Sequence, residues 1–184
     1  MPTEIINVVP GMIEYKGTTL DRFGLDQTGK ITYTFNQQGF RSDYNFDFIP
    51  SYAFFGCSLV VGIGVPIEQT FASYFLDSQN YGQAGRYSNV SIFESIEQFI
   101  NSHLYRPDIC MAVFWTDRGA NLLDEYYHKL SNLSMIHFFC GNPLPYSNCY
   151  PMVANLDHDV SNTHIGPATH KFIYKLLCSL FDRL

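Results

Sequence analysis

A serine and a histidine stand out in this chain because their sequence neighbours favour chemistry. Ser58 follows the apolar stretch 52–55 and a glycine, so we expect a strand to break sharply just before it. His164 lies in a polar loop before the last helical pattern. An imidazole that takes the seryl proton, oriented by a carboxylate, is the minimum for acyl transfer. An ordinary strand-to-helix turn would also place a small residue at position 58.

Two carboxylates precede the histidine and are candidates to orient it. Asp159 lies five residues before His164 and is the predicted partner, while Asp157 is the alternative. A site that uses neither acid would be a Ser–His dyad. The same loop also contains His158, but the spacing of these side chains matches no common zinc pattern. We therefore predict a metal-free and cofactor-free site.

Alternating strand and helix patterns predict the scaffold that positions these residues. The runs 52–55 and 109–115 are continuously apolar, which is typical of central strands covered on both faces, so we expect these two strands to be neighbours. Further strands are predicted at 133–139 and 152–154. Helical spacing predicts helices that begin near Pro66, at Ser91 with a capping box, near Leu122 and at Pro167. This order indicates an α/β fold with a mainly parallel sheet in three layers, α/β/α.

The chain has the length of one domain, 1–184, with 1–50 expected as a β-rich N-terminal lead-in packed on it. The stretch 31–35 alternates branched and aromatic residues, as a strand does, whereas 80–89 is predicted to be a loop. His170, in the last helix, is expected at the surface. Cys110 and Cys178 are expected to be buried free thiols, because both sit inside apolar runs and no CxxC pair exists.

Composition limits the classes of partner. The net charge is −6 and no Lys/Arg cluster occurs, which argues against nucleic acid. The sequence shows no membrane span and no signal peptide, so a cytoplasmic location is expected. Charged residues make up only 15% of the chain and aromatic residues 16%, which favours an apolar groove or a self-association face, and hence a homo-oligomer.

Several short motifs in order along the chain resemble those of one enzyme group. They are Gly56-Cys57-Ser58, then 62–65, 80–85 and 164–167, with a similar lead-in at 33–42. Over roughly 33–100 and 150–184 the chain resembles the SGNH (GDSL-type) hydrolase superfamily. The resemblance implies a flavodoxin-like fold and ester or acyl-transfer chemistry. It implies that Ser58 is the nucleophile, that the Ser58 and Gly85 N–H groups are oxyanion donors, and that His164 is the general base.

The chain departs from the family pattern on both sides of the predicted site. The family's Asp before the serine is Cys57 here, and its Asp three residues before the histidine is Ser161. A nucleophilic Cys57 is an alternative, although it sits one position away from the family's nucleophile.

A third departure concerns the oxyanion asparagine that the family carries after its central strand. Thr116 stands near this place and is the predicted hydroxyl donor, with Asn121 a more remote candidate. An ionised Asp117 would repel an oxyanion. Arg86, next to Gly85, is a candidate to bind an anionic group of the substrate or is a solvated loop residue.

These observations predict a serine-dependent hydrolase that cleaves a small-molecule or carbohydrate ester through an acyl-enzyme. An acyltransferase with the same Ser58 and His164 site is the first alternative, and a non-catalytic binding module on this fold is the second. The sequence does not separate hydrolase from transferase, because that difference lies in acceptor binding and water exclusion.

Overall fold

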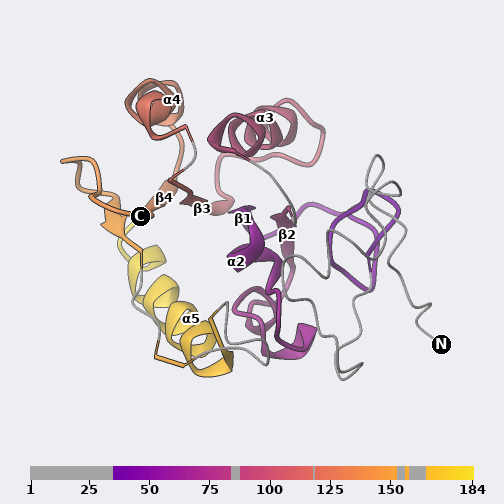
Figure 1. Ribbon diagram of the computed structural model, residues 1–184. Coiled ribbons are helices and arrows are strands. Elements are labelled where there is room, and N and C mark those ends of the chain that lie inside the picture. The colour runs from indigo at the N-terminus through magenta and orange to yellow at the C-terminus, as the bar shows by residue number, and fades with distance from the viewer. Residues whose placement is uncertain (1–34, 84–87, 118, 153–155, 158–164) are drawn as a thin grey trace.

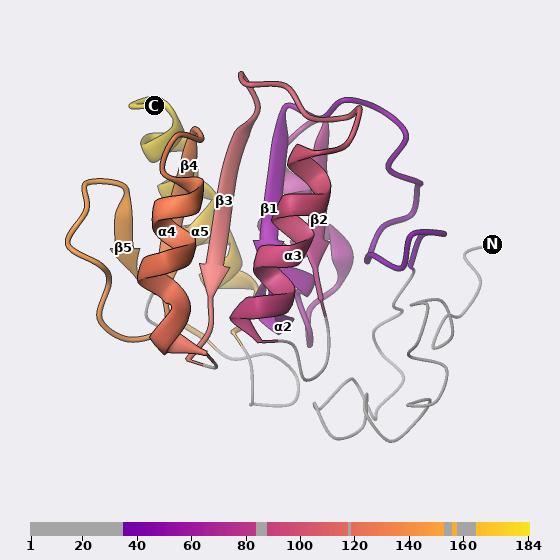
Figure 2. The same cartoon turned by 90° about the horizontal axis from the view of Figure 1, so that it is seen from above.

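The computed structural model describes residues 35–83, 88–117, 119–152, 156–157 and 165–184. Its centre is a parallel sheet with the strand order β2-β1-β3-β4-β5. The strands are β1 (Tyr52–Gly56), β2 (Ser78–Gly82), β3 (Cys110–Trp115), β4 (Met135–Phe139) and β5 (Cys149–Pro151). All four neighbouring pairs are parallel, as the arrowheads of β1, β3 and β5 show in Figure 2, so the carboxyl ends of the strands share one edge of the sheet.

The two apolar runs of the sequence form the neighbouring central strands, as predicted. Phe55 of β1 lies beside Val113 of β3 in the parallel register, and both side chains are fully buried. Continuous apolarity is required here because each strand is covered on both faces.

Helices cover both faces of this sheet in three layers (Figure 1). The helices α3 (Asn89–Ile100) and α4 (Leu123–Leu130) pack on one face, and α5 (Pro167–Phe181) packs on the other. Two 3₁₀ helices, η2 (Ile67–Gln69) and η3 (Ala72–Tyr74), share the face of α5, and a third, η4 (Ala120–Leu122), precedes α4. The four-residue α2 (Ser58–Val61) follows β1. The predicted α/β three-layer class with a parallel sheet is therefore confirmed.

The α-helix predicted from Pro66 is wrong, because η2 and η3 occupy this stretch. Thr70 between them is extended, with ψ 151°, and its hydroxyl donates to the Ile67 carbonyl at 2.8 Å. A threonine that bonds the local backbone in this way competes with an α-helix. The apolar spacing still marked buried residues correctly, since Phe71 and Phe75 are in the core.

The sequence also missed a strand where it predicted the loop 80–89. The strand β2 is rich in polar residues, and these are satisfied internally: the Gln79 amide donates to the Phe48 carbonyl at 2.7 Å and its oxygen accepts the Tyr81 hydroxyl. The helix α3 begins at Asn89, ahead of the capping box predicted from Ser91. The last strand, β5, ends at Pro151 and precedes the predicted 152–154.

Residues 35–50 are the described part of the predicted lead-in, and they do pack on the domain. They form one isolated antiparallel bridge, between Phe35 and Arg41. The rings of Phe40 and Phe46 lie 5.0 and 5.2 Å from the ring of Tyr81 in β2. The strand predicted at 31–35 lies outside the described residues except for Phe35.

All five cysteines are free thiols, but Cys110 and Cys178 are half-buried and not fully enclosed. None of the helices in the described part of the chain has the length and hydropathy of a membrane span.

Candidate active site

Ser58 is the first residue of the one-turn helix α2, directly beyond the carboxyl end of the central strand β1. Cys57 is the N-cap, and its carbonyl accepts the Val60 amide at 2.9 Å. The Ser58 carbonyl accepts the amides of Gly62 and Ile63, each at 3.1 Å. Ser58 is half-buried and its hydroxyl lies 3.9 Å from the Cys57 sulfur. The hydroxyl is thus placed at the edge where all the strands end.

Glycines on two neighbouring strands allow α2 to lie this close to the sheet. An added Cβ on Gly56 would lie 2.5 Å from Cγ2 of Val60, and one on Gly82 would lie 2.5 Å from the Val61 nitrogen. The second contact is with backbone, which cannot rotate away. The position of the Ser58 turn therefore depends on a glycine at the end of β2.

Asn80 joins the same turn to β2 by hydrogen bonds. Its amide nitrogen donates to the Val60 carbonyl at 2.7 Å, and its oxygen accepts the Gly82 amide at 2.9 Å. The sequence reasoning treated Asn80 only as part of a loop motif. The signal that could have revealed this role is the pairing of an asparagine with a glycine two residues later, where a side-chain oxygen reaches the later amide.

Thr116, the predicted oxyanion donor, follows β3 and is held by Asn89. The Asn89 oxygen accepts both the Thr116 amide at 2.8 Å and the Thr116 hydroxyl at 3.3 Å, and the Asn89 nitrogen donates to the Thr116 carbonyl at 2.8 Å. Asn89 is fully buried in the first turn of α3. The Thr116 hydroxyl lies at the carboxyl edge of the sheet, in hydrogen-bond contact with Asn89.

Asp157 serves the start of α5. Its carboxylate accepts the amides of Ala168 and Thr169 and the Thr169 hydroxyl, each at 2.8 Å. Partial burial would raise the pKa of Asp157, but these hydrogen bonds and nearby His170 outweigh it and lower the pKa below its usual value. This carboxylate is therefore committed to capping the start of α5.

The start of α5 also lies close to the Ser58 side of the sheet. Ile165, the residue after His164, is buried in the same apolar cluster as Val60 of α2. His170, one turn into α5, accepts the Phe71 amide at Nδ1 over 3.2 Å. The prediction that His170 is a surface residue is wrong, because it is fully buried. His170 is three and seven residues before Ile173 and Leu177, so it lies on the same buried face of α5 as these residues.

The structure describes two of the predicted site residues, Ser58 and Thr116, and places both at the carboxyl edge of neighbouring strands. Gly85, Arg86, Asp159 and His164 lie outside the described residues. Within the described ranges, no group of three or more His, Cys, Asp or Glu side chains has the arrangement of a metal site.

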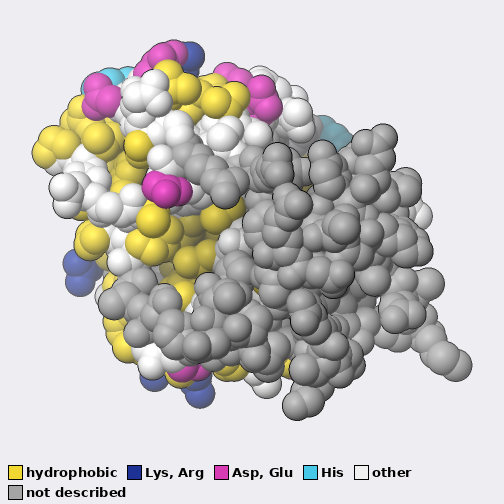
Figure 3. Space-filling view, viewed as in Figure 1, with side chains coloured by type: hydrophobic (Ala, Val, Ile, Leu, Met, Phe, Trp, Pro, Cys, Tyr) yellow, Lys and Arg dark blue, Asp and Glu magenta, His cyan; other side chains and the backbone are white. Residues whose placement is uncertain are grey.

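The carboxyl edge carries an apolar hollow on the described surface. Figure 3 looks onto this edge and shows hydrophobic side chains gathered in a hollow, with an acidic side chain beside it.

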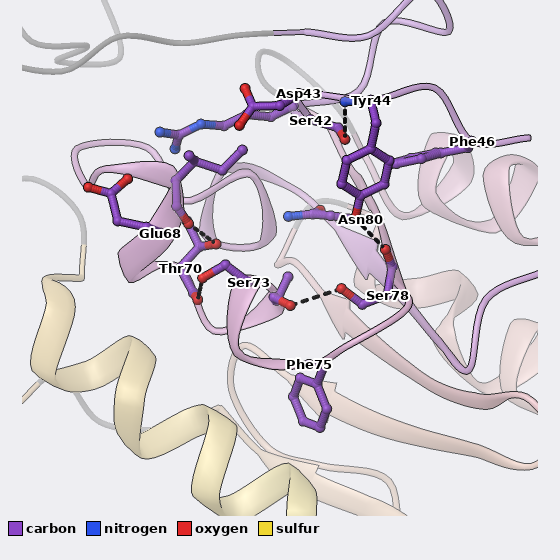
Figure 4. A pocket seen from close by; sticks show the side chains of 13 residues that line it. Ser42, Asp43, Tyr44, Phe46, Glu68, Thr70, Ser73, Phe75, Ser78 and Asn80 are labelled. Carbon is purple, nitrogen blue, oxygen red and sulfur yellow. Dashed lines mark hydrogen bonds between the residues drawn. The ribbon is translucent and has the colours of Figure 1, made fainter. Parts of the chain in front are cut away.

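A separate cavity of about 260 Å³ lies between residues 41–46 and 67–80, and its lining includes neither Ser58 nor Thr116. In Figure 4 the hydroxyls of Thr70, Ser73 and Ser78 point to backbone carbonyls, so this cavity offers few unused donors.

Comparison with known proteins adds little beyond the fold class. No protein-family model matches this chain, and no curated protein matches it. The chain is similar to a solved structure of a member of the lipolytic protein G-D-S-L family from Veillonella parvula DSM 2008, at 13% identity over 72% of each chain, with a TM-score of 0.34. At this TM-score the likeness carries no argument about activity, and membership of the superfamily stays a prediction.

The described geometry suits attack by a hydroxyl. A half-buried serine stands at the start of a turn that is fixed by glycine packing and by Asn80, and a buried amide holds the next strand end at Thr116. Preorganised groups of this kind cost no reorganisation during a reaction. What the described residues leave open is the base, which the sequence assigns to His164.

Proposed function

We propose that this protein is a serine-dependent ester hydrolase with Ser58 as its nucleophile. The observation that carries the proposal is the placement of Ser58 on a fixed turn at the carboxyl end of the central strand. The substrate is a small-molecule or carbohydrate ester whose acyl part enters the apolar hollow.

The reaction runs in two steps. The Ser58 hydroxyl attacks the acyl carbon and passes its proton to His164, which Asp159 orients. The N–H groups of Ser58 and Gly85 stabilise the oxyanion, and the Thr116 hydroxyl joins them by turning its proton away from the Asn89 oxygen to which it donates in the structure. The alcohol leaves with the proton from His164. Water then attacks the acyl-enzyme by the same route and releases the acid. Arg86 is the candidate contact for an anionic part of the substrate.

A fluorophosphonate probe with mass-spectrometric site mapping tests this assignment. We expect labelling at Ser58, none in Ser58→Ala, and labelling at least about 100-fold slower in His164→Ala, because the general base is lost. Ser131→Ala is a matched control, since Ser131 is exposed and its hydroxyl donates to the His128 carbonyl at 2.9 Å.

Turnover of a short p-nitrophenyl ester, with and without an added alcohol, completes the test. If the added alcohol does not reduce hydrolysis, the protein is a hydrolase. If the acyl group goes to the alcohol in preference to water, the protein is a transferase. Labelling that persists in Ser58→Ala, or activity abolished by modification of Cys57, would overturn the assignment to Ser58. A native chain that is neither labelled nor active would be a binding module.

A further inference from the structure

Arg41 comes from the lead-in, yet its side chain ends beneath the turn that carries Ser58. It is only 2% exposed. Its guanidinium donates to three backbone carbonyls: Val61 at 3.1 Å, Gly62, and Val65 at 2.8 Å. These carbonyls belong to the last residue of α2 and to the turn that follows it. The Arg41 side chain therefore holds the C-terminal end of the Ser58 turn by hydrogen bonds.

The helix α2 needs such support because it has only four residues. A single turn of helix does not hold itself, since nucleation costs more free energy than its few hydrogen bonds return. A cation at the end where carbonyls converge is favourable. Gly62 closes the turn with φ 71°, and an added Cβ there would lie 3.3 Å from Nη1 of Arg41. The turn and the guanidinium are thus in direct contact.

We propose that Arg41 is a positioning residue of the ester-hydrolase site, which holds the Ser58 hydroxyl at its point of attack by clamping the carbonyls of residues 61, 62 and 65. This inference rests on the function proposed above. Asn80 fixes the middle of the same turn through the Val60 carbonyl, and Arg41 fixes its end. Displacing a reacting group by about 1 Å can cost about 100-fold in rate.

The planar guanidinium is what this arrangement requires. It presents five N–H donors in a rigid fork, whereas an ammonium is a compact point charge with three donors. Lysine at position 41 would keep the charge and lose the fixed geometry, and glutamine would lose both. The two variants therefore separate charge from shape.

Kinetics of ester turnover and of fluorophosphonate labelling test the proposal. We expect kcat to fall about 10-fold in Arg41→Lys and about 100-fold in Arg41→Gln, with KM within about twofold of wild type, because the loss is one of alignment. Arg106→Lys and Arg106→Gln are matched controls, since Arg106 also donates to two carbonyls, of His103 and Tyr105, but is exposed. Their kcat should match wild type.

Hydrogen exchange of the same variants, followed by mass spectrometry, gives a readout that needs no activity. We expect Arg41→Lys to lower the protection of amides in 60–65, with peptides covering β3 unchanged, whereas a merely structural role would lower protection throughout. If the wild-type protein is neither labelled nor active, the proposed function fails. Loss of protection confined to residues 60–65 in Arg41→Lys would then still support the role of Arg41 in holding the turn. Wild-type kcat in both Arg41 variants, or unchanged or uniformly lowered protection, would overturn the positioning role.

Discussion

The indole nitrogen of Trp115 donates to Nδ1 of His137 over 3.2 Å, between two neighbouring strands of the sheet. His137 is fully buried, and an imidazole that accepts at Nδ1 must carry its proton at Nε2, which is buried and has no hydrogen-bond partner among the described residues. His170 repeats the pattern, because Nδ1 accepts the Phe71 amide and the buried Nε2 has no partner in the part of the chain that the structure describes. Both histidines are therefore held neutral.

The stability of the protein should fall steeply on mild acidification. Burial lowers the pKa of His137 to about 4, and burial together with the nearby Arg41 charge lowers the pKa of His170 to about 4. The unfolded chain takes up these protons from about pH 6.5 downward, so the stabilisation is complete above that pH and is lost as pH falls towards 4. Each histidine should cost about 3 kcal/mol of unfolding free energy between pH 7 and pH 4.

Urea denaturation at several pH values checks this. His137→Asn and His170→Asn keep an acceptor near the Nδ1 position and should each remove part of the pH dependence, whereas His103→Asn, at an exposed position, should not. An unfolding free energy that is level from pH 7 to pH 5 would contradict the prediction.

Gly82→Ala should abolish the proposed ester turnover through sterics alone. The new Cβ would meet the Val61 nitrogen at 2.5 Å and the Val60 carbonyl carbon at 2.7 Å, so α2 must move. We expect ester turnover to fall by at least about 100-fold, because Ser58 moves with the helix. The control is Gly141→Ala, whose Cβ meets nothing within 4 Å and should cost only about 1–2 kcal/mol of stability from its φ of 114°. Wild-type turnover in Gly82→Ala would show that the turn is not so constrained.

Asn89→Ala should lower the stability of the fold by about 2–3 kcal/mol, because it removes three hydrogen bonds to Thr116 in a buried setting. Turnover should also fall, since Thr116 loses its fixed position. Asn101→Ala removes one exposed hydrogen bond, to the Glu97 carbonyl, and should change stability by under about 0.5 kcal/mol. Equal losses in the two variants, measured by urea unfolding, would refute the bracing role of Asn89.

Asp157 and Asp159 should separate stability from catalysis. Asp157→Ala removes the cap of α5 and should cost about 1–2 kcal/mol of stability with little effect on turnover. In the proposed mechanism Asp159 orients His164, so Asp159→Ala should lower turnover at least about 100-fold and leave stability unchanged. Thermal melts and ester assays on both variants decide, and the reverse pattern would make Asp157 the catalytic acid.

The sequence predicted those parts of the fold that apolar periodicity controls. The central strands, the buried stripe of α3 and the helix from Pro167 all follow from burying apolar side chains, which leaves a periodic trace. The strand β2 left no such trace, because Ser78 and Gln79 are buried through hydrogen bonds to distant carbonyls. His170 was misplaced for the same reason: a histidine in a helix looks like a surface residue until its partner, Phe71, is known.

Of the candidate site, the sequence singled out Ser58, the proposed nucleophile, but not the groups that hold its turn. Ser58 carries a local signal, the glycine before it and the helix after it. Arg41, Asn80 and Asn89 act over separations of 20 to 27 residues, as the hydrogen bonds show, and no local pattern reports such distances. The roles assigned to Ser58 and Thr116, like those of His164, Asp159, Gly85 and Arg86, stay predictions.

The lead-in has a consequence for solubility. An outer strand of a sheet exposes a row of unused N–H and C=O groups, which other chains can pair with. Here the lead-in lies along β2: the Gln79 amide donates to the Phe48 carbonyl, and the Tyr44 hydroxyl donates to the Ser78 carbonyl at 3.0 Å. At the opposite margin β5 has only three residues and ends in Pro151, which has no amide hydrogen. A chain shortened to begin at residue 51 would therefore uncover the margin of β2 and should aggregate from that side.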